Sequence, residues 1–349
     1  MPPPDSNPSA EPETLLEVDH LDVVFPTEGG TVYAVRDSTF KLKAGRTLAI
    51  VGESGSGKSV SCYAILRILQ DPGRIDGGRI LFHSKRRGET LDLAALNAKD
   101  PWLFKIRGGS ISLIFQEPQT ALSPVHTIGN QLIEAIRLHQ DLTKKEARER
   151  AIEMLRTVGM PEPENRIDQY PHEISGGMRQ RVVIGMALVC RPEILIADEP
   201  TTALDVTVQA QILDLINELK EKFKTSVIFI THDLGVVAQI ADDVVVMNKG
   251  RIVEKGTVYE IFEDPIHPYT QRLMAAMPRI DDEAGKLASV REENVSDPDW
   301  VPAGHSLHPE KPGWWSPDIV TPVEPVLHGF SDSRSVLIWP RNKPETTVK

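Results

Sequence analysis

Apolar and polar side chains alternate near the start of the chain, and this pattern predicts a strand from Leu15 to Phe25. Gly29 and Gly30 predict a hairpin turn, after which Val32 to Leu42 continues as strand. Thr47 to Val51 is apolar on both alternating faces, which is typical of a strand that is covered on both sides. The first fifty residues therefore predict three strands.

Further strands and a block of helices follow. Two glycines precede a predicted strand from Arg79 to Phe82, a polar stretch runs on to Asp100, and Ser110 to Phe115 is again strand-like. Between Thr127 and Cys190 the spacing of apolar residues becomes helical. Strand and helix then alternate in three predicted elements: a strand from Ile194 to Ala197, a helix from Val206 to Phe223 and a strand from Ser226 to Ile230. The pattern predicts an α/β core that carries a helical insert.

The composition is that of a globular protein, with 40% hydrophobic and 26% charged residues among 349. This length allows one large domain with appendages, or two domains. The longest apolar stretch, Val182 to Cys190, is much shorter than the ~18 to 20 residues of a membrane span. Residues 1–13 are proline-rich and acidic without the apolar centre of a secretion signal, so we expect a disordered tail and a cytoplasmic protein.

Charge and cysteine content narrow the possible functions. The formal net charge of −11 argues against a dedicated nucleic-acid binder that lacks a separate basic patch. Cys62 and Cys190 are the only cysteines, and both fall on predicted buried helix faces. We interpret them as small core residues that form neither a disulfide nor a metal site.

The clearest chemical motif directly follows the third predicted strand. It consists of Gly52, Glu53, Ser54, Gly55, Ser56, Gly57, Lys58 and Ser59. This is the pattern G-x-x-x-x-G-K-[ST], in which glycines let successive backbone N–H groups turn toward phosphate oxygens. The alternative is a glycine-rich loop that only turns the chain, but the strand before the loop and the helix after it favour phosphate binding. The chain is therefore predicted to bind a nucleoside triphosphate.

Specific roles follow for two residues of this loop. A helix predicted from Lys58 to Gln70 directs the positive end of its dipole at the same anion. We expect Lys58 to reach the β- and γ-phosphates and the Ser59 hydroxyl to bind Mg²⁺.

A buried strand farther along the chain ends in two carboxylates, Asp198 and Glu199. A strand that is apolar on both faces belongs in a parallel sheet, and we expect this one beside the strand that leads into the phosphate loop. There, Asp198 would hold Mg²⁺ through water, and Glu199 would orient or deprotonate the attacking water. The alternative is a strand that simply ends in two solvated acids.

A second glycine-containing segment lies upstream of this strand. Ser175 is a reasonable N-cap for the apolar helix that ends near Cys190, and Gly176 and Gly177 leave backbone N–H groups exposed for an anion. Such a helix start is commonplace on its own. Its position shortly before an acid-ended strand favours an anion site.

Taken in order, these motifs resemble the ATP-binding subunit of ABC transporters. The matching residues are the phosphate loop, Gln116, the signature Ser175 to Gln180, Asp198 and Glu199, Ala203 to Asp205, and His232 within Thr231 to Asp233. The resemblance covers Leu15 to Pro278. Longer segments look like the dipeptide/oligopeptide permease branch: Phe115 to Pro124, Tyr170 to Arg181, and His267 to Gln271 followed by Pro278 and Arg279.

This resemblance implies a fold and its parts. The fold is α/β: a P-loop NTPase domain of the ABC type, with an antiparallel β-subdomain, a helical signature subdomain and an irregular C-terminal extension. We expect the ATP-binding domain at residues 14–278, the inserted helical subdomain at about 117–190, and the extension at 279–349. Many family members carry a four-cysteine cluster in the extension. Because no cysteine follows Cys190 here, an iron–sulfur site is excluded.

The resemblance also implies a site shared between two subunits. Two ATP-binding subunits sandwich two nucleotides, and the phosphate loop of one faces the signature of the other. The signature residues are Ser175, Gly176, Gly177, Met178 and Gln180. Met178 resembles the first of the two ATPases that such importers often pair, and Asp205 would couple the two sites across the dimer.

Catalytic roles are implied in the same way. Glu199 would be the base, and His232 would hold the γ-phosphate and its water, although a lone histidine after a strand is more often structural. Gln116 would sense Mg²⁺ and the water, so that Mg²⁺ is bound through Ser59, Gln116 and Asp198.

An aromatic side chain of the first strands is expected to stack on adenine. Phe25 is the first candidate and Tyr33 the second, because either arm of the hairpin could present the ring. A packed core aromatic is the alternative for each of them.

The implied function is an ATPase that uses ATP and Mg²⁺ to power an ABC importer of peptides or similar small solutes. Its partners would be a second ATP-binding subunit, identical or homologous, two integral membrane permease subunits and an extracytoplasmic solute-binding protein acting through them, with no nucleic acid. It would lie peripherally on the cytoplasmic face of the inner membrane.

Two rival functions fit the sequence less well than transport. A soluble ABC-type ATPase that acts on DNA or the ribosome typically carries long coiled coils, zinc cysteines or a second such domain, and this acidic chain has none of them. A P-loop kinase would leave the signature helix and His232 without a role. The sequence therefore favours transport.

Overall fold

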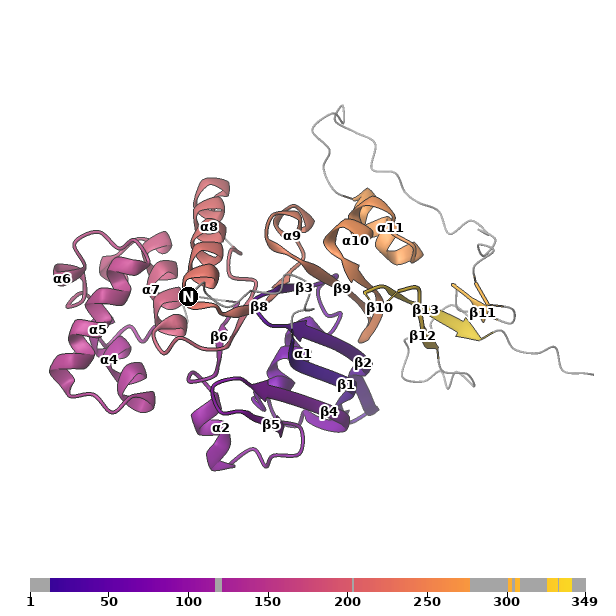
Figure 1. Cartoon of the computed structure of the whole chain (residues 1–349), viewed down its shortest axis with the longest axis horizontal. Helices are drawn as coiled ribbons and strands as arrows, with labels where there is room; N and C mark the ends of the chain where they lie inside the picture. The colour runs from indigo at the N-terminus through magenta and orange to yellow at the C-terminus, as the bar shows by residue number, and fades with distance from the viewer. Residues whose placement is uncertain are drawn as a thin grey trace, which may run out of the picture.

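The computed structural model describes residues 13–116, 121–202, 204–276, 301–302, 305–307, 325–331 and 333–340. Two β-sheets occupy the middle of this part of the chain, and a lobe of helices lies at one end (Figure 1). The tail predicted for residues 1–13 falls outside the described residues apart from Glu13. Three tryptophans of the C-terminal extension, Trp300, Trp314 and Trp315, also lie outside the described residues.

The smaller sheet is antiparallel and has the strand order β2-β1-β4-β5. Its strands are β1 (Thr14–Thr27), β2 (Gly30–Lys43), β4 (Arg74–Ser84) and β5 (Glu89–Asp92). β1 and β2 form the predicted hairpin, in which Thr27 pairs with Gly30. Side chains such as Val18, Leu21 and Phe82 are fully buried, so one face of this sheet covers the core.

The larger sheet has the order β11-β13-β10-β9-β3-β8-β7-β6, and β12 pairs with β13. Its strands are β3 (Thr47–Val51), β6 (Ile111–Ile114), β7 (Ile194–Asp198), β8 (Ser226–Thr231), β9 (Asp243–Asn248), β10 (Arg251–Thr257), β11 (His305–Ser306), β12 (Val326–Gly329) and β13 (Ser335–Pro340). The strands from β9 through β3, β8 and β7 to β6 run parallel. The expectation that β7 lies beside β3 was wrong, because β8 pairs with both and separates them.

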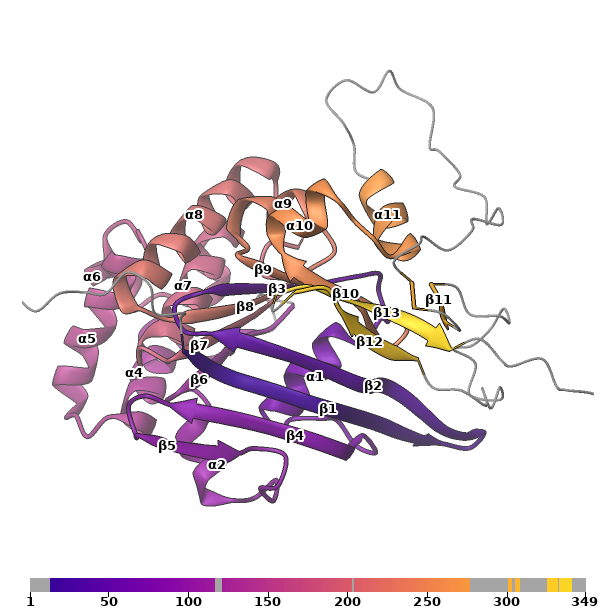
Figure 2. The same cartoon turned by 45° about the vertical axis from the view of Figure 1, so that its right-hand side comes forward.

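Helices surround the larger sheet and form the lobe. They are α1 (Lys58–Ile65), α2 (Pro101–Ile106), α4 (Ile128–His139), α5 (Lys144–Thr157), α6 (Pro163–Arg166), the 3₁₀ turn η1 (Pro171–Glu173), α7 (Gly176–Leu188), α8 (Val206–Phe223), α9 (Leu234–Ile240), α10 (Val258–Glu263) and α11 (Pro268–Ala275). Polar residues fix the first residue of several helices. Thr127 caps α4, and Thr143 with Glu146 forms a capping box at the start of α5. The lobe consists of α4 to α7 (Figure 2).

The core lies on both faces of β3, because successive side chains of a strand point to opposite sides. Ile50 packs with apolar residues of β1, β2, β4 and α1. Ala49 and Val51 pack on the other face, against residues of α9, α10, α11 and β13. A third cluster joins the helical lobe to α8. The strand that leads into the phosphate loop is therefore held from both sides.

Several elements differ from the prediction. The helix predicted to reach Gln70 ends at Ile65, because Arg67 adopts a left-handed backbone with φ 55° that interrupts the helical hydrogen bonds. The glycine pair at 77–78 lies inside β4, where the register with β1 shifts, and not before the strand. The polar stretch to Asp100 contains β5, and α2 follows it.

The C-terminal extension, expected to be irregular, contributes strands where it is described. β13 extends the larger sheet by pairing with β10, with Glu254 opposite Val336. Val336 and Trp339 are buried, and Trp339 packs in the cluster that covers Val51. Residues of the extension are therefore part of the core that surrounds β3.

Two negative findings concern the described part of the chain. No helix there combines the length and the apolar character needed to cross a membrane. Within the same residues, no three or more histidine, cysteine, aspartate or glutamate side chains gather as a metal site would require. Cys62 is buried, Cys190 is half-buried, and both are free thiols.

Trp339→Ala should lower the free energy of unfolding by about 3 kcal/mol, the usual cost of a cavity left by a large aromatic side chain. Val326→Ala on the neighbouring strand is the control, because Val326 is 53% exposed and should cost less than about 1 kcal/mol. Denaturant unfolding measures both. Equal effects would show that the extension does not belong to the core.

Candidate functional site

The candidate residues follow the ends of four parallel strands. The phosphate loop follows β3, Gln116 follows β6, Asp198 ends β7, and His232 follows β8. Parallel strands bring their carboxyl ends to the same edge of a sheet, where open α/β sheets bind ligands. The order of the strands therefore collects residues that lie far apart in sequence.

Lys58 stands at the start of α1 with only 6% of its surface exposed. Its Nζ donates to the carbonyl oxygen of Gly52 at 2.8 Å and to that of Glu53 at 2.9 Å. Burial lowers the pKa of Lys58, and the nearby carboxylates of Glu199 and Asp198 act in the opposite direction. A cation so placed among backbone dipoles is suited to bind a multiply charged anion.

The phosphate loop is enclosed by two neighbouring segments. Gly57 precedes α1 with φ +100°, and a Cβ there would lie 2.5 Å from the carbonyl oxygen of Ala34 in β2. The N–H of Gly250, in the turn between β9 and β10, donates to the carbonyl of Ser56 at 3.0 Å. Only glycine fits at position 57 without moving β2.

Asp198 is fully buried at the end of β7. The Ser59 hydroxyl donates to its Oδ1 at 2.9 Å, and the Tyr63 hydroxyl donates to its Oδ2 at 3.1 Å. Burial raises the pKa of Asp198, while these two hydrogen bonds lower it. The hydroxyl of Ser59 and the carboxylate of Asp198 are oxygen donors of the kind that Mg²⁺ prefers, so the pair fits this ion.

Three side chains contact the carboxylate of Glu199, two of them from other strand ends and one from the following turn. Its Oε2 accepts from Gln116 Nε2 at 3.1 Å and from Thr202 Oγ1 at 3.0 Å. Its Oε1 lies 3.3 Å from Nδ1 of His232. Gln116 and His232, both predicted members of the site, therefore meet at this carboxylate.

The backbone of Glu199 is strained. It adopts φ 46°, in the left-handed region that costs a non-glycine residue about 1–2 kcal/mol. Its N–H donates to the carbonyl of Ile230 in β8 at 3.0 Å, which ties the strained residue to the sheet. Backbone strain of this kind gathers at functional sites, where the surrounding structure maintains it.

The signature lies apart from this edge. Both views place α7 in the helical lobe, away from α1 (Figures 1 and 2). Ser175 is exposed and caps α7 by accepting from the N–H of Met178 at 3.4 Å. Gly176 has open space around it, whereas Gly177 lies against Val208 of α8.

Two predicted signature residues face inward. Gln180 is fully buried, and its Nε2 donates to the carbonyl of Pro200 at 2.6 Å. Met178 packs against the core cluster of the lobe. The expectation that Gln180 faces a partner's nucleotide was therefore wrong for its side chain. The amide of Gln180 is buried within its own chain, where it links α7 to the turn after Glu199.

Asp205 caps α8 and accepts from the N–H of Val208 at 2.9 Å. Its side chain is exposed at the surface, as is that of the next residue, Val206. The preceding Ala203, which belonged to the predicted motif, lies outside the described residues.

The two aromatic candidates occupy different surroundings. The ring of Phe25 lies against Gly73 and packs on the core, which matches the core alternative. Tyr33 is 42% exposed, with the Arg36 guanidinium 4.8 Å from its ring centroid. Tyr33 precedes Ala34, whose carbonyl lies against Gly57, so it stands nearer to the phosphate loop.

Three residues that contact the candidate site, Tyr63, Thr202 and Tyr269, were not predicted from the sequence. Tyr63 lies one helical turn after Ser59, so its contact with Asp198 could have been found from helical spacing. Thr202 lies three residues after Glu199. Tyr269 accepts a hydrogen bond from the N–H of Glu53 at 3.0 Å, and no local pattern connects two residues 216 positions apart.

Two family models match the chain. The first, described as ABC transporter, matches residues 35–202. The second, described as oligopeptide/dipeptide transporter, C-terminal region, matches residues 253–304.

Curated relatives are similar along most of the chain. The oligopeptide transport ATP-binding protein OppD of Bacillus subtilis is 46% identical over 96% of this chain and 93% of its own length. The dipeptide transport ATP-binding protein DppD of the same organism is 52% identical, covering 80% of this chain and 81% of its own. OppD of Salmonella typhimurium is 51% identical over 79% of this chain and 80% of its own.

Solved structures share the fold. The ATP-binding cassette MJ0796, in a dimeric post-hydrolysis state bound to ADP and Pi, superposes with a TM-score of 0.60 at 26% identity, covering 70% of this chain and 98% of that one. The protein CbiO1 of Clostridium perfringens, part of an ABC transporter complex, gives 0.60 at 28% identity over 72% of this chain and 92% of its own.

Gly57→Ala should distort the loop far more than Gly55→Ala. Both residues have positive φ, but a Cβ at Gly55 would meet nothing within 4 Å, whereas one at Gly57 would meet the backbone of Ala34. We expect Gly55→Ala to lower the free energy of unfolding by about 1 kcal/mol and Gly57→Ala by at least about 2 kcal/mol. Denaturant unfolding without nucleotide compares the two, and equal costs would contradict the close contact with β2.

Proposed function

This chain belongs to the ABC transporter family, in its oligopeptide and dipeptide branch, and on that premise we propose how its residues bind and hydrolyse ATP. It is the ATP-binding and ATP-hydrolysing subunit of an ABC importer of peptides or similar solutes. The family models and the curated relatives support this function, and nothing in them favours the alternative of an ATPase acting on DNA or the ribosome.

The phosphate loop binds the triphosphate in this proposal. Backbone N–H groups of residues 52–59 and the start of α1 face the phosphate oxygens. Lys58, buried and held by two loop carbonyls, supplies the positive charge. Mg²⁺, when bound, would be held by Ser59, Asp198 and Gln116, and would neutralise charge on the phosphate oxygens.

Glu199 is the proposed general base. Its carboxylate accepts hydrogen bonds from Gln116 and Thr202, and it stands beside His232. These contacts orient the carboxylate so that it can take a proton from the attacking water. His232 then holds the water and the γ-phosphate. The convergence of Gln116 and His232 on Glu199, from the ends of three parallel strands, is the observation that carries the proposal.

The signature is proposed to serve the nucleotide of a second subunit. Ser175 is exposed and Gly176 is open, so their polar groups are accessible to a partner. They lie in the lobe, away from the phosphate loop of their own chain (Figure 1). Asp205 and Val206, which is 84% exposed, offer a further contact between subunits. Tyr33 is our candidate for stacking on adenine, ahead of Phe25.

The remaining partners follow from the family. ATP-binding subunits of peptide transporters work as a pair of cassettes with membrane permease subunits, and they lie peripherally on the membrane. We further propose that an extracytoplasmic solute-binding protein acts through the permeases, and that this subunit lies on the cytoplasmic face of the inner membrane. Residues 14–278 would carry the ATP-binding site, with the helical subdomain at about 117–190, and the described strands of the extension would complete the core of this domain.

Glu199→Gln should leave ATP binding close to wild type and lower steady-state phosphate release by at least about 100-fold, the usual share of a general base. Lys58→Ala is the contrasting variant and should weaken ATP binding itself by about 10-fold or more, through the loss of charged hydrogen bonds. Titration with labelled ATP and a phosphate-release assay separate the two effects. Turnover of Glu199→Gln near the wild-type rate would refute the base.

The tagged chain should co-purify with integral membrane permease subunits when native membranes are solubilised in mild detergent. Nuclease treatment is the control, because it removes associations that depend on nucleic acid. Mass spectrometry should identify two kinds of membrane protein and a cassette subunit. Recovery with ribosomes or DNA, and without membrane proteins, would instead support the rival function.

A further inference from the structure

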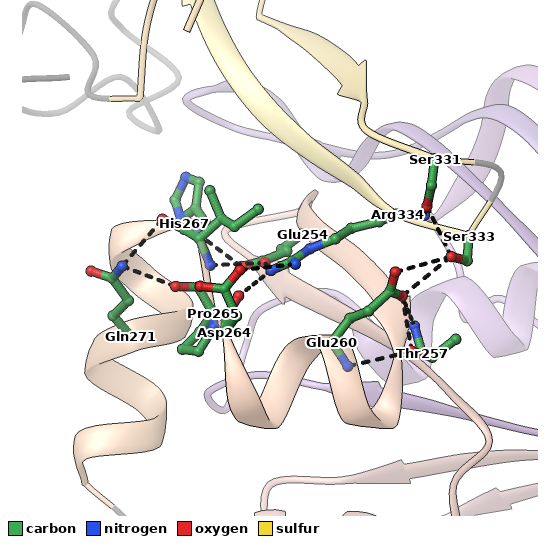
Figure 3. A network of polar contacts seen from close by, with 11 residues as sticks. Glu254, Thr257, Glu260, Asp264, Pro265, His267, Gln271, Ser331, Ser333 and Arg334 are labelled. Carbon is green, nitrogen blue, oxygen red and sulfur yellow. Dashed lines mark hydrogen bonds and ion pairs between the residues drawn. The ribbon is translucent and has the colours of Figure 1, made fainter. Parts of the chain in front are cut away.

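The C-terminal extension meets the ATP-binding domain through a buried ion pair (Figure 3). Arg334, which directly precedes β13, places its Nη2 3.3 Å from Oε1 of Glu254 and its Nη1 3.3 Å from Oδ2 of Asp264. Its Nη2 also donates to the carbonyl of Asp264. The Glu254 side chain is fully buried and that of Arg334 is 10% exposed, so water does not screen the pair.

Glu254 also fixes the segment that leads into α11. Its Oε1 accepts from the N–H of Ile266 at 3.0 Å, and its Oε2 accepts from the N–H of His267 at 2.9 Å. His267 in turn caps α11, because its Nδ1 accepts from the N–H of Tyr269 at 3.1 Å. A fully buried carboxylate requires such donors and a cation. The start of α11 therefore depends on Glu254, and Glu254 on Arg334.

Tyr269, in the first turn of α11, contacts the phosphate loop. It is 5% exposed, and its hydroxyl accepts from the N–H of Glu53 at 3.0 Å. The carbonyl of the same Glu53 accepts from Nζ of Lys58 at 2.9 Å and from the N–H of Ser56 at 3.2 Å. One residue of the loop thus links α11 to the lysine of the nucleotide site.

We propose that Tyr269 is a positioning residue for the phosphate loop. Arg334 of the extension in turn fixes the position of Tyr269, through Glu254 and the start of α11. The route runs from Arg334 to Glu254, then to the start of α11, then from Tyr269 to Glu53 and Lys58. By ordering the loop before ATP arrives, these contacts lower the conformational cost of binding. The extension thereby tunes the affinity of the subunit for ATP, an inference that rests on the proposed function.

Tyr269→Phe tests the last link, because it keeps the packed ring and removes only the hydroxyl. We expect the Kd and KM for ATP to rise about 2- to 10-fold, which corresponds to one hydrogen bond, with kcat changed by less than about 2-fold. Amide exchange of residues 52–59 without nucleotide should become faster. An unchanged Kd and unchanged exchange would overturn the proposal, even if the unfolding midpoint fell, because that pattern is purely structural.

Arg334→Met tests the first link from the extension. It should raise the Kd for ATP in the same direction and speed amide exchange in the phosphate loop. Ser333→Ala is the matched control, because Ser333 contacts Glu260 of α10 at 3.2 Å and not Glu254. It should leave both readouts at the wild-type level. If Arg334→Met does not fold, Arg334→Lys takes its place, since it keeps the charge and loses the two-pronged contact.

The double variant Tyr269→Phe with Arg334→Met decides whether the two residues act through one route. If they do, its Kd should stay within about 2-fold of that of the weaker-binding single variant. Multiplied effects would show independent action and overturn the coupling. Wild-type protein and Lys58→Ala are measured alongside. Failure of the wild type to bind ATP would refute the proposed function, whereas normal wild-type binding with unaltered variants would refute only this inference.

Discussion

The structure depends on one constraint, the parallel direction of β3, β6, β7 and β8. Parallel strands bring their carboxyl ends to one edge, where the phosphate loop, Gln116, Asp198, Glu199 and His232 lie at or after the strand ends. β8 separates β7 from β3, yet the Ser59 hydroxyl still reaches Asp198 at 2.9 Å, because α1 begins at the same edge. The core on both faces of β3 keeps this edge in place.

The signature lies apart from this edge, because it begins a helix of the lobe (Figure 1). Gln180, in the second turn of α7, donates to the carbonyl of Pro200 and ties this helix to the turn after Glu199. Ser175 is exposed at the start of α7 and does not belong to the sheet edge. This hydrogen bond of Gln180 connects the turn after Glu199, the proposed general base, with the helix that we propose to contact the nucleotide of a second subunit.

The C-terminal extension shares the sheet and the core of the strand that leads into the phosphate loop. β13 adds to the central sheet, and Trp339 packs in the cluster that covers β3. Arg334 neutralises a carboxylate that no water reaches, and burying such a charge without a partner would be costly. These contacts make the extension a structural part of the domain, with a hydrogen-bonded path to the phosphate loop.

The sequence alone was enough to locate the phosphate-loop motif, the acid-ended strand and the signature motif, because each consists of neighbouring residues with a characteristic spacing. The order of these motifs along the chain then indicated the family. Helix α8 was also predicted with its observed bounds, since its apolar period is uninterrupted. Only the tertiary structure decided that β8 lies between β3 and β7, that Gln180 faces inward, and that Tyr269 contacts Glu53. These facts depend on strand order and on contacts between residues as far as 216 positions apart, which no local pattern records.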